Sequence, residues 1–481
     1  IHADQHRIDC LGCYGNKDVR TPHIDALAAN GVRFENSFCP YPVCTPSRYS
    51  LISGQYVHEH RGWSNHCTLP PGTETFPGIL RKAGYRTKAV GKMHFTPTYL
   101  DVGFDELALA EQNGPGRWDD DYHRALRDAG LVDYNDLEDQ EREYRKDARP
   151  EYWQTFGAMP SNLPDEYHST QWIGDRAAET IAQWGPSGNL LMAGFIKPHH
   201  PFDPAPSNSG LYDPESLTVL PGWTTECLPR DEELSKGYFP NADLTEASMR
   251  RVMAYYYATI EEIDRQVGRM VALLKEKGLY DNTLIVYTAD HGDYMGFHHM
   301  ILKGNHMYDP LMKVPLILKY PGGRQAGTVS AALVNNIDLA PTIVRQTGLE
   351  PASTMHGLDL ATDPVRDIVF AESREGEHAM ARSKTRKLIL WPAKNTGYFF
   401  DLEKDPLEMD NRFDDPVCQD EVKAFTKAIL DWRAFDTLPK VYVDENAPVI
   451  GQPNVPSRKD GHREAIYGYF QEKMRKPPAG A

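Results

Sequence analysis

The sequence has few cysteines and no long apolar run. Seven cysteines occur in 481 residues, too few and odd in number for a disulfide framework in a chain of this size. Cys10 and Cys13 form a C-x-x-C motif, but no second pair follows at the spacing of a zinc site, so we interpret the pair as structural. No apolar run approaches the ~20 residues that a membrane helix needs, and we expect no membrane partner.

Basic residues are also in the minority. The chain has 52 Lys and Arg against 68 Asp and Glu, a net charge of −16, which disfavours a nucleic-acid partner because phosphate backbones require clustered cations. A local cleft can still attract an anion. No secretion signal is visible, and because Ile1 lies one turn before an apparent site residue we expect an upstream segment to be missing. The compartment, cytoplasm or periplasm, therefore stays open.

What is present is a soluble globular composition, with 40% hydrophobic and 25% charged residues. Apolar β-rich runs at 86–90, 190–196, 283–288 and 314–320 predict strands. Amphipathic stretches at 21–29, 75–83, 166–184, 244–277 and 338–346 predict helices, the fourth capped by Thr245 and stopped by Gly278. This alternation predicts an α/β sandwich of helices around a large, mainly parallel sheet.

Composition changes divide the chain further. We expect a catalytic domain at 1–364 with a charged, aromatic insertion at 117–164 near the site. A smaller α+β subdomain, with strands at 367–371, 385–391 and 398–402 and a closing helix at 420–435, should occupy 365–436. The last stretch, 437–481, predicts an extended arm over the surface or over a partner subunit of a homo-oligomer.

Polar clusters follow three of the predicted strands. Gly91-Lys92, Lys197-Pro198-His199 and Asp290-His291 each come where a strand ends. In open α/β sheets, ligands bind beyond the carboxyl ends of the strands. The three clusters, distant in sequence, should therefore meet at one edge of the sheet.

The segment Cys44-Thr45-Pro46-Ser47-Arg48 predicts a helix start, with Thr45 as the cap, Pro46 in the first turn and Gly54 as the stop. Cys44 would lie at a positive helix terminus that stabilises an anion. Arg48, one turn along, could reach back toward it. The plainer alternative is a capped short helix with a buried cysteine.

This segment resembles the C-x-P-x-R signature of the type I, formylglycine-dependent sulfatases of the alkaline phosphatase-like superfamily. Further motifs of that family recur here in order, up to about Phe413. They are Asp4-Gln5, T-P-H-I-D-A-L-A-A-N-G-V-R-F from Thr21, Gly91-Lys92-Met93-His94, Lys197-Pro198-His199-His200-Pro201-Phe202, Asp290-His291-Gly292 with Lys303 downstream, and D-L-E-K-D-P-L-E from Asp401 with Asn411.

The resemblance implies a hydrolase that cleaves sulfate esters with one divalent cation. The family oxidises the signature cysteine to formylglycine, whose hydrate attacks sulfur, so Cys44 would be the nucleophile and would need a separate maturation enzyme. The implied metal ligands are Asp4, Gln5, Cys44, Asp290 and His291. Oxygen-rich ligation favours Ca²⁺, with Mg²⁺ as an alternative. Gln5 and His291 replace commoner carboxylate and amide ligands, which makes Mn²⁺ a further candidate.

The family also implies roles for charged groups around the sulfate. Asp290 would help to deprotonate the attacking hydroxyl, and Arg48 and Lys92 would hold the formylglycine hydrate. His94 would take a proton as the sulfated hemiacetal collapses. His199 or Lys303 would protonate the leaving alcohol or bridge the sulfate oxygens. Taken singly, His94 is more typical of a structural histidine and Lys303 of a solvated lysine; their order beside Cys44 favours catalysis.

The substrate is less constrained, because specificity in such folds comes from loops. We expect a sulfated carbohydrate, in oligosaccharide or small-molecule form. Candidate sugar contacts are Trp118, Asp119, Asp120, Asp121, His123 and Trp153 in the insertion, and His58, His60 and Arg61; packing is the alternative for each. His200, His298 and His299 are either surface or supporting groups.

Two other functions stay open. A phosphonate monoester or phosphodiester hydrolase shares the fold, the modified cysteine and the Asp-Gln and Asp-His pairs. Lys92 and His94 argue against it, since we expect that branch to replace them. A non-catalytic protein that binds sulfated glycan would have lost a nucleophile, base or metal ligand, and none is missing. A mutase or alkaline phosphatase relative would use Ser or Thr as the nucleophile and a site with two metals. The C-T-P-S-R segment and the single-metal ligand set argue against that function.

Overall fold

The computed structural model describes residues 1–112, 119–232, 239–362, 366–434 and 462–475. Its main sheet has the strand order β4-β3-β5-β1-β6-β7-β2-β8. Strand β7 runs antiparallel to β6 and β2, and the other neighbours are parallel, which confirms the mainly parallel sheet. The bounds are β1 His2–Asp4, β2 Val32–Phe38, β3 Arg86–Gly91, β4 Glu106–Leu109, β5 Asn189–Pro198, β6 Ile285–Ala289, β7 Leu316–Lys319 and β8 Thr328–Asn335.

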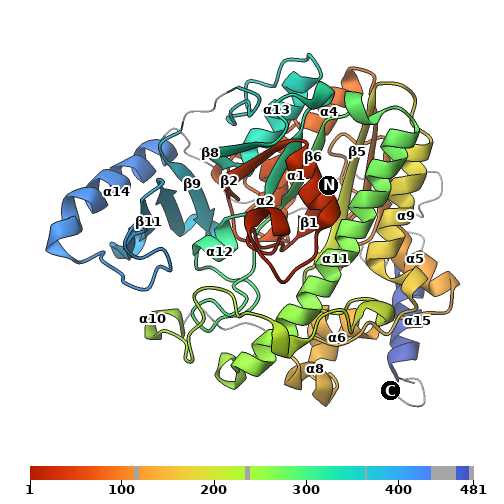
Figure 1. Ribbon diagram of the computed structural model, residues 1–481, viewed down its shortest axis with the longest axis horizontal. Coiled ribbons are helices and arrows are strands. Elements are labelled where there is room, and N and C mark those ends of the chain that lie inside the picture. Colours follow the sequence, from red (N-terminus) through yellow and green to blue (C-terminus); the bar gives the residue numbers. More distant parts are fainter. Residues whose placement is uncertain (113–118, 233–238, 363–365, 435–461, 476–481) are drawn as a thin grey trace.

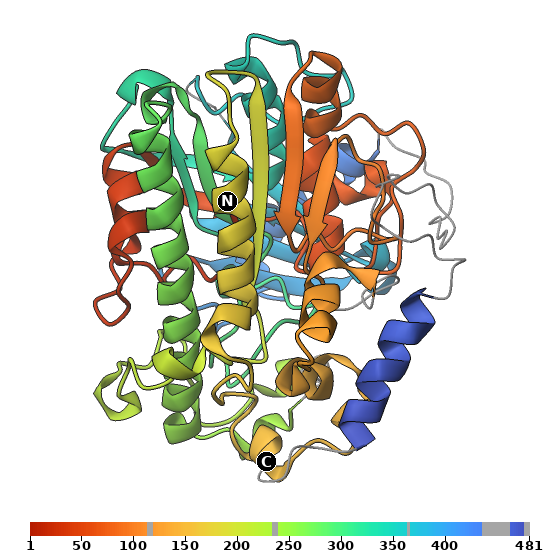
Figure 2. The same cartoon turned by 90° about the vertical axis from the view of Figure 1, so that its right-hand side faces the viewer.

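Helices cover both faces of this sheet, as the alternating pattern predicts (Figures 1 and 2). One apolar core joins the sheet to α1 Pro22–Ala29, α9 Ser169–Ala182 and α11 Glu246–Glu276. A second core joins the other face to α2 Cys44–Ser53, α4 Phe76–Lys82 and α13 Leu339–Gln346. Thr245 caps α11 by accepting the Ser248 N–H. None of the described helices is both long enough and apolar enough to span a bilayer.

Strand register brings the predicted polar clusters to one edge. His2 of β1 and Gly91 of β3 both pair with Gly194 of β5, and His2 also pairs with Thr288 of β6. The residues that follow these positions therefore leave the sheet at one level. The polar groups after β1, β3, β5 and β6 meet there, as the parallel topology requires.

Short helices follow β4 and flank this edge. They are α5 Asp121–Asp128, α6 Tyr134–Gln140, α7 Arg142–Arg145 and α8 Pro150–Gln154. The helix α15, His462–Arg475, packs on them through Ile466 and Phe470 against Val132 and Leu137. Of the predicted insertion, Arg117 and Trp118 lie outside the described residues, as do 437–461 and 476–481 of the predicted arm.

The C-terminal part forms a smaller antiparallel sheet of order β12-β11-β10-β9, covered by α14 Gln419–Arg433. Its strands are β9 Val369–Ser373, β10 His378–Arg382, β11 Arg386–Trp391 and β12 Thr396–Asp401. This confirms the α+β subdomain and adds β10, which was not predicted. In Figure 1 it lies beside β8 and α12, Asp309–Met312.

Candidate active site

Cys44 is the first residue of α2, so the helix starts two residues earlier than a Thr45 cap would place it. Val43 occupies the N-cap position without a side-chain cap, and Gly54 ends the helix at φ +67°, as predicted. Thr45 is therefore not the cap, which corrects the sequence-based expectation. Its Oγ1 instead donates to the His94 carbonyl at 2.7 Å, and its N–H donates to Asn65 Oδ1 at 3.1 Å. Cys44 thus lies in the first turn, at the positive end of the helix.

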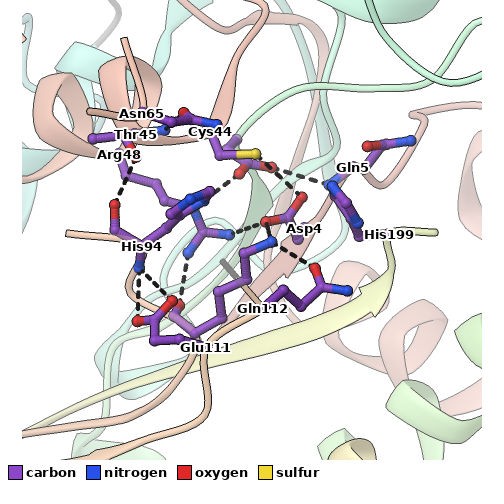
Figure 3. A network of polar contacts seen from close by, with 12 residues as sticks. Asp4, Gln5, Cys44, Thr45, Arg48, Asn65, His94, Glu111, Gln112 and His199 are labelled. Atoms are coloured by element: carbon purple, nitrogen blue, oxygen red, sulfur yellow. Dashed lines mark hydrogen bonds and ion pairs between the residues drawn. The ribbon is translucent and has the colours of Figure 1, made fainter. Parts of the chain in front are cut away.

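Arg48 joins the carboxylates of two different strands (Figure 3). Its NH2 group donates to Asp4 Oδ2 at 2.8 Å and its Nε to Asp290 Oδ2 at 2.9 Å, and all three side chains are fully buried. Burial alone would raise the pKa of Asp4, but cationic groups led by Lys92, with Arg48 among them, hold that pKa well below its usual range. Arg48 therefore fixes the two carboxylates, and its hydrogen bonds go to Asp4, Asp290 and the Lys92 carbonyl.

Lys92 extends from the end of β3 to the same carboxylate. Its Nζ lies 2.8 Å from Asp4 Oδ2 and donates to Gln112 Oε1 at 2.8 Å. Gln112, which was not predicted, also donates to Asp136 Oδ1 and to the His200 carbonyl. Lys92 was predicted because polar residues just after a strand end lie at the site. The same rule would point to Gln112, but strand β4 was not predicted.

Three polar groups surround the Cys44 thiol. Its Sγ lies 3.0 Å from Lys303 Nζ, 3.3 Å from His291 Nε2 and 3.7 Å from Asp4 Oδ1. Burial and Asp4 would raise the pKa of Cys44, yet Lys303 and His291 contribute to holding it well below its usual value. The site therefore stabilises negative charge at this position. In a formylglycine enzyme, Sγ stands in for an oxygen of the modified residue.

The tautomer of His199 follows from its contacts. Its Nδ1 donates to the His200 carbonyl at 2.6 Å, so Nε2 is left to accept from Lys303 Nζ at 2.8 Å. Burial, followed by Lys303, lowers the pKa of His199 well below the usual histidine range. His199 is therefore a neutral imidazole that accepts a hydrogen bond from a charged ammonium, and the proton between them belongs to Lys303.

A cation could bind between β1, β6 and α2. Asp4, Cys44, Asp290 and His291 each offer one ligand atom, and the four atoms lie within 4.8 Å of one another. The Nδ1 of His291 donates to the Gly292 carbonyl at 2.9 Å, which leaves Nε2 as the ligand. The residues therefore fit a divalent cation with mixed oxygen and nitrogen ligands.

Gln5 directs its side-chain amide nitrogen to Asp293, which is not one of the four candidate ligands. Its Nε2 donates to Asp293 Oδ2 at 2.5 Å, and its backbone N–H donates to Asp290 Oδ1 at 3.0 Å. The Gln5 Oε1 is buried and has no hydrogen-bond partner among the described residues. A buried amide oxygen beside two carboxylates is a suitable additional ligand for a cation.

His94 is held by its backbone. Its N–H donates to the Glu111 carboxylate at 2.9 and 3.1 Å, and its carbonyl accepts from Thr45. Both ring nitrogens are buried without a hydrogen-bond partner among the described residues. The ring is therefore available to a group that enters the site.

Most of the candidate sugar contacts prove to be packing groups. His58 Nδ1 lies 3.0 Å from Glu372 Oε2, and His60 Nε2 2.8 Å from Ser50 Oγ. In the insertion, Asp119 forms an ion pair with Arg124, and Asp120 with His123. Asp121 accepts hydrogen bonds from the Tyr99 hydroxyl and the Leu109 N–H. Trp153 packs on Tyr152 and Phe239. His200, His298 and His299 are buried and hydrogen-bonded. The alternative of packing therefore holds for these residues; Trp118 lies outside the described part of the chain.

Comparison with known proteins decides the family. The family model described as Sulfatase matches residues 1–349, which is most of the chain. The chain belongs to the sulfatase family. A second model, described as N-sulphoglucosamine sulphohydrolase, C-terminal, matches residues 297–434, which include the smaller sheet and α14 of this sulfatase family member.

Relatives of this sulfatase family member are distant but span nearly all of it. It is 27% identical to an arylsulfatase of Clostridium perfringens, over 94% of this chain and 97% of the relative. It is also 27% identical to an N-acetylglucosamine-6-O-sulfatase of Bacteroides thetaiotaomicron, over 85% of this chain and 81% of that relative. The phosphonate monoester hydrolase of Agrobacterium radiobacter has the same fold, with a TM-score of 0.75 at 23% identity over 94% of this chain and 99% of that one.

Proposed function

We propose that this protein hydrolyses sulfate monoesters, with a formylglycine made from Cys44 as the nucleophile and one divalent cation. The observation that carries the proposal is the surroundings of Cys44 Sγ. Polar atoms of Lys303, His291 and Asp4 lie 3.0 to 3.7 Å from it. Arg48 and Lys92 in turn form ion pairs with Asp4. Cations around a helix terminus stabilise the charge that builds on sulfuryl oxygens in the transition state.

The cation would be held by Asp4, Asp290, His291 and the modified Cys44, with Gln5 Oε1 as a further ligand. When bound, it polarises a sulfuryl oxygen and favours the ionised nucleophile. Because an imidazole is among the ligands, we place Mn²⁺ ahead of Ca²⁺ as the resident ion.

The chain's own groups supply the proton transfers. The Lys303–His199 pair lies beside the nucleophile and protonates the leaving alcohol oxygen as the sulfur–oxygen bond breaks. Lys92 and Arg48 hold Asp4 and Asp290 in place. His94, whose ring nitrogens have no other partner among the described residues, accepts the hydroxyl proton when sulfate is expelled and returns it to solvent.

We infer a sulfated carbohydrate as the substrate, on the strength of the N-acetylglucosamine-6-O-sulfatase among the relatives. The buried state of most predicted sugar contacts leaves recognition to groups at the mouth of the site. Of the candidates, Arg61 is partly exposed, at a positive φ of 63° just after α3, Val57–His60.

A phosphonate monoester hydrolase is the second candidate, favoured by the structural match and by the Asp-Gln and Asp-His pairs. Measuring kcat/KM for an aryl sulfate and for the matching aryl phosphonate, on protein with converted Cys44, separates the two. We expect the sulfate to be preferred, because Lys92 and His94 are both present. A preference for the phosphonate would overturn the proposal, and binding of a sulfated sugar without turnover of either ester would indicate a binding protein.

A further inference from the structure

A carboxylate that takes no part in the proposed chemistry lies beneath His94. Glu111 follows β4, which pairs in parallel with β3 so that Leu109 lies opposite Gly91. The residues after both strands therefore leave the sheet side by side. The Glu111 carboxylate accepts the Met93 N–H at 3.0 Å and the His94 N–H at 2.9 and 3.1 Å, and its residue is only 1% exposed.

No lysine or arginine of the described residues pairs with Glu111 at ion-pair distance. Two successive backbone N–H groups hold its carboxylate instead, an arrangement that binds anions well. The Glu111 N–H in turn donates to Asp120 Oδ2 at 2.8 Å, and the other oxygen of Asp120 accepts from His123 in the first turn of α5. The backbone of Glu111 is therefore held by Asp120, and its carboxylate by the two N–H groups.

The contact between Glu111 and the His94 N–H holds a backbone conformation that residues with a side chain rarely adopt. His94 has a φ of +55°, in the left-handed region that is unfavourable for residues other than glycine. Its N–H is held by Glu111 and its carbonyl by Thr45, the residue next to Cys44. The His94 ring nitrogens have no hydrogen-bond partner among the described residues, so the hydrogen bonds that hold this residue are those of its backbone.

We propose that Glu111 is a positioning residue for His94, because its carboxylate fixes the turn that carries the ring. This rests on the proposed function, in which His94 accepts a proton as sulfate leaves. Carboxylates that orient a catalytic histidine usually bind its ring; here the carboxylate binds the main chain and acts on the ring through the turn.

The test is Glu111→Gln, which keeps the shape and one acceptor oxygen but replaces the second acceptor oxygen by an amide donor. We expect kcat to fall about 10- to 100-fold with KM within about threefold, since a positioned base contributes at least that much. A burst of alcohol release ahead of sulfate release should appear, because only the second step is slowed.

Asp264 provides a matched control. It is a buried carboxylate that accepts two successive N–H groups, those of His23 and Ile24, at the start of α1. Asp264→Asn should lower the melting temperature without producing a burst or a selective loss of kcat. If Glu111→Gln behaves like Asp264→Asn, Glu111 is only structural and the proposal is wrong. Both variants are assayed on whichever ester the wild type hydrolyses. The role of Glu111 can therefore fail while the sulfatase proposal stands, and the reverse.

Discussion

Arg48 is the residue on which the charge balance of the site depends. It is fully buried and is shared by Asp4 and Asp290, which come from different strands. Removing one member of a buried ionic group leaves the remaining charges undercompensated, which costs far more than the intact group contributes. Without Arg48, Asp4 would keep only Lys92 of the described residues as an ion-pair partner, and Asp290 would lose its arginine. The site is therefore sensitive to this one side chain both in folding and in turnover.

We expect Arg48→Met to lower the free energy of unfolding of the metal-free protein by about 3–5 kcal/mol, because two buried carboxylates lose their shared cation. Chemical denaturation measures this. Arg81→Met is the control, since Arg81 and Asp101 form a largely exposed pair worth about 0.2–1 kcal/mol. Equal losses in the two variants would contradict the role given to Arg48. Turnover should vanish in Arg48→Met alone.

Lys303 should matter in proportion to the difficulty of the leaving group. If Lys303 and His199 protonate the departing oxygen, Lys303→Ala slows alkyl sulfates more than nitrophenyl sulfate, whose leaving group needs little protonation. We expect a loss in kcat/KM of about 10²–10⁴ for the alkyl ester. A loss independent of the leaving group would restrict Lys303 to binding the sulfate.

The motif residues could be predicted from the sequence because their spacing is specific. Cys44, Arg48 and Asp290 were named in this way, and the structure brings them together. Gln112, Glu111 and Asn65 could not be found, because they act from loops through contacts with Lys92, His94 and Thr45 that no motif encodes. His58 of α3 was considered as a sugar contact, since its burial against Glu372 is invisible in the sequence.

At the scale of elements, length decided what could be predicted. The 31-residue helix α11 has a clear apolar period and a cap, so its bounds were close to the prediction. Strands β1 and β4, of three and four residues, are too short to show a period. Yet β1 lies centrally in the sheet and carries Asp4, and β4 leads to Glu111. Pairing with longer neighbours, and not local sequence, defines both strands.

Helix α11 also carries a carboxylate whose ionisation opposes folding. Burial raises the pKa of Glu262 to about 7. Its Oε2 faces His168 Nδ1 at 3.5 Å, and that nitrogen already accepts the Thr170 N–H. Two acceptors therefore face each other unless Glu262 is protonated.

The folded state thus keeps a proton that the unfolded state releases from about pH 4.5 upward. The Glu262 contribution to the free energy of unfolding should therefore decline between about pH 4.5 and pH 7 and change little above. We expect Glu262→Gln, which mimics the neutral acid, to become more stable than the wild type at pH 8, by up to about 3 kcal/mol. Denaturation curves at pH 5 and pH 8 measure it; a difference that does not grow with pH would contradict the assignment.

At the scale of the whole molecule, the site joins parts that are distant in sequence. Asp4, Cys44, His199, Asp290 and Lys303 come from five segments that only the parallel topology brings together. Folding and metal binding should therefore be coupled, because an ion that binds only the folded state stabilises it.

We expect a chelator to abolish turnover and to lower the melting temperature. Mn²⁺ should restore both better than Ca²⁺, because the His291 imidazole suits the softer ion. Scanning calorimetry and turnover after dialysis against each ion test this. Full activity in the presence of chelator would remove the cation from the account, and a clear preference for Ca²⁺ would contradict the ranking of Mn²⁺ ahead of Ca²⁺.

The central claim is that a converted Cys44 performs the hydrolysis. The most direct measurement is the mass of the peptide containing Cys44, in preparations with different sulfatase turnover. The account predicts a fraction that is lighter by about 18 Da, the thiol-to-aldehyde difference required for this covalent catalysis, with turnover proportional to that fraction and absent in Cys44→Ala. Sulfatase turnover in a preparation where Cys44 is wholly unmodified would contradict it.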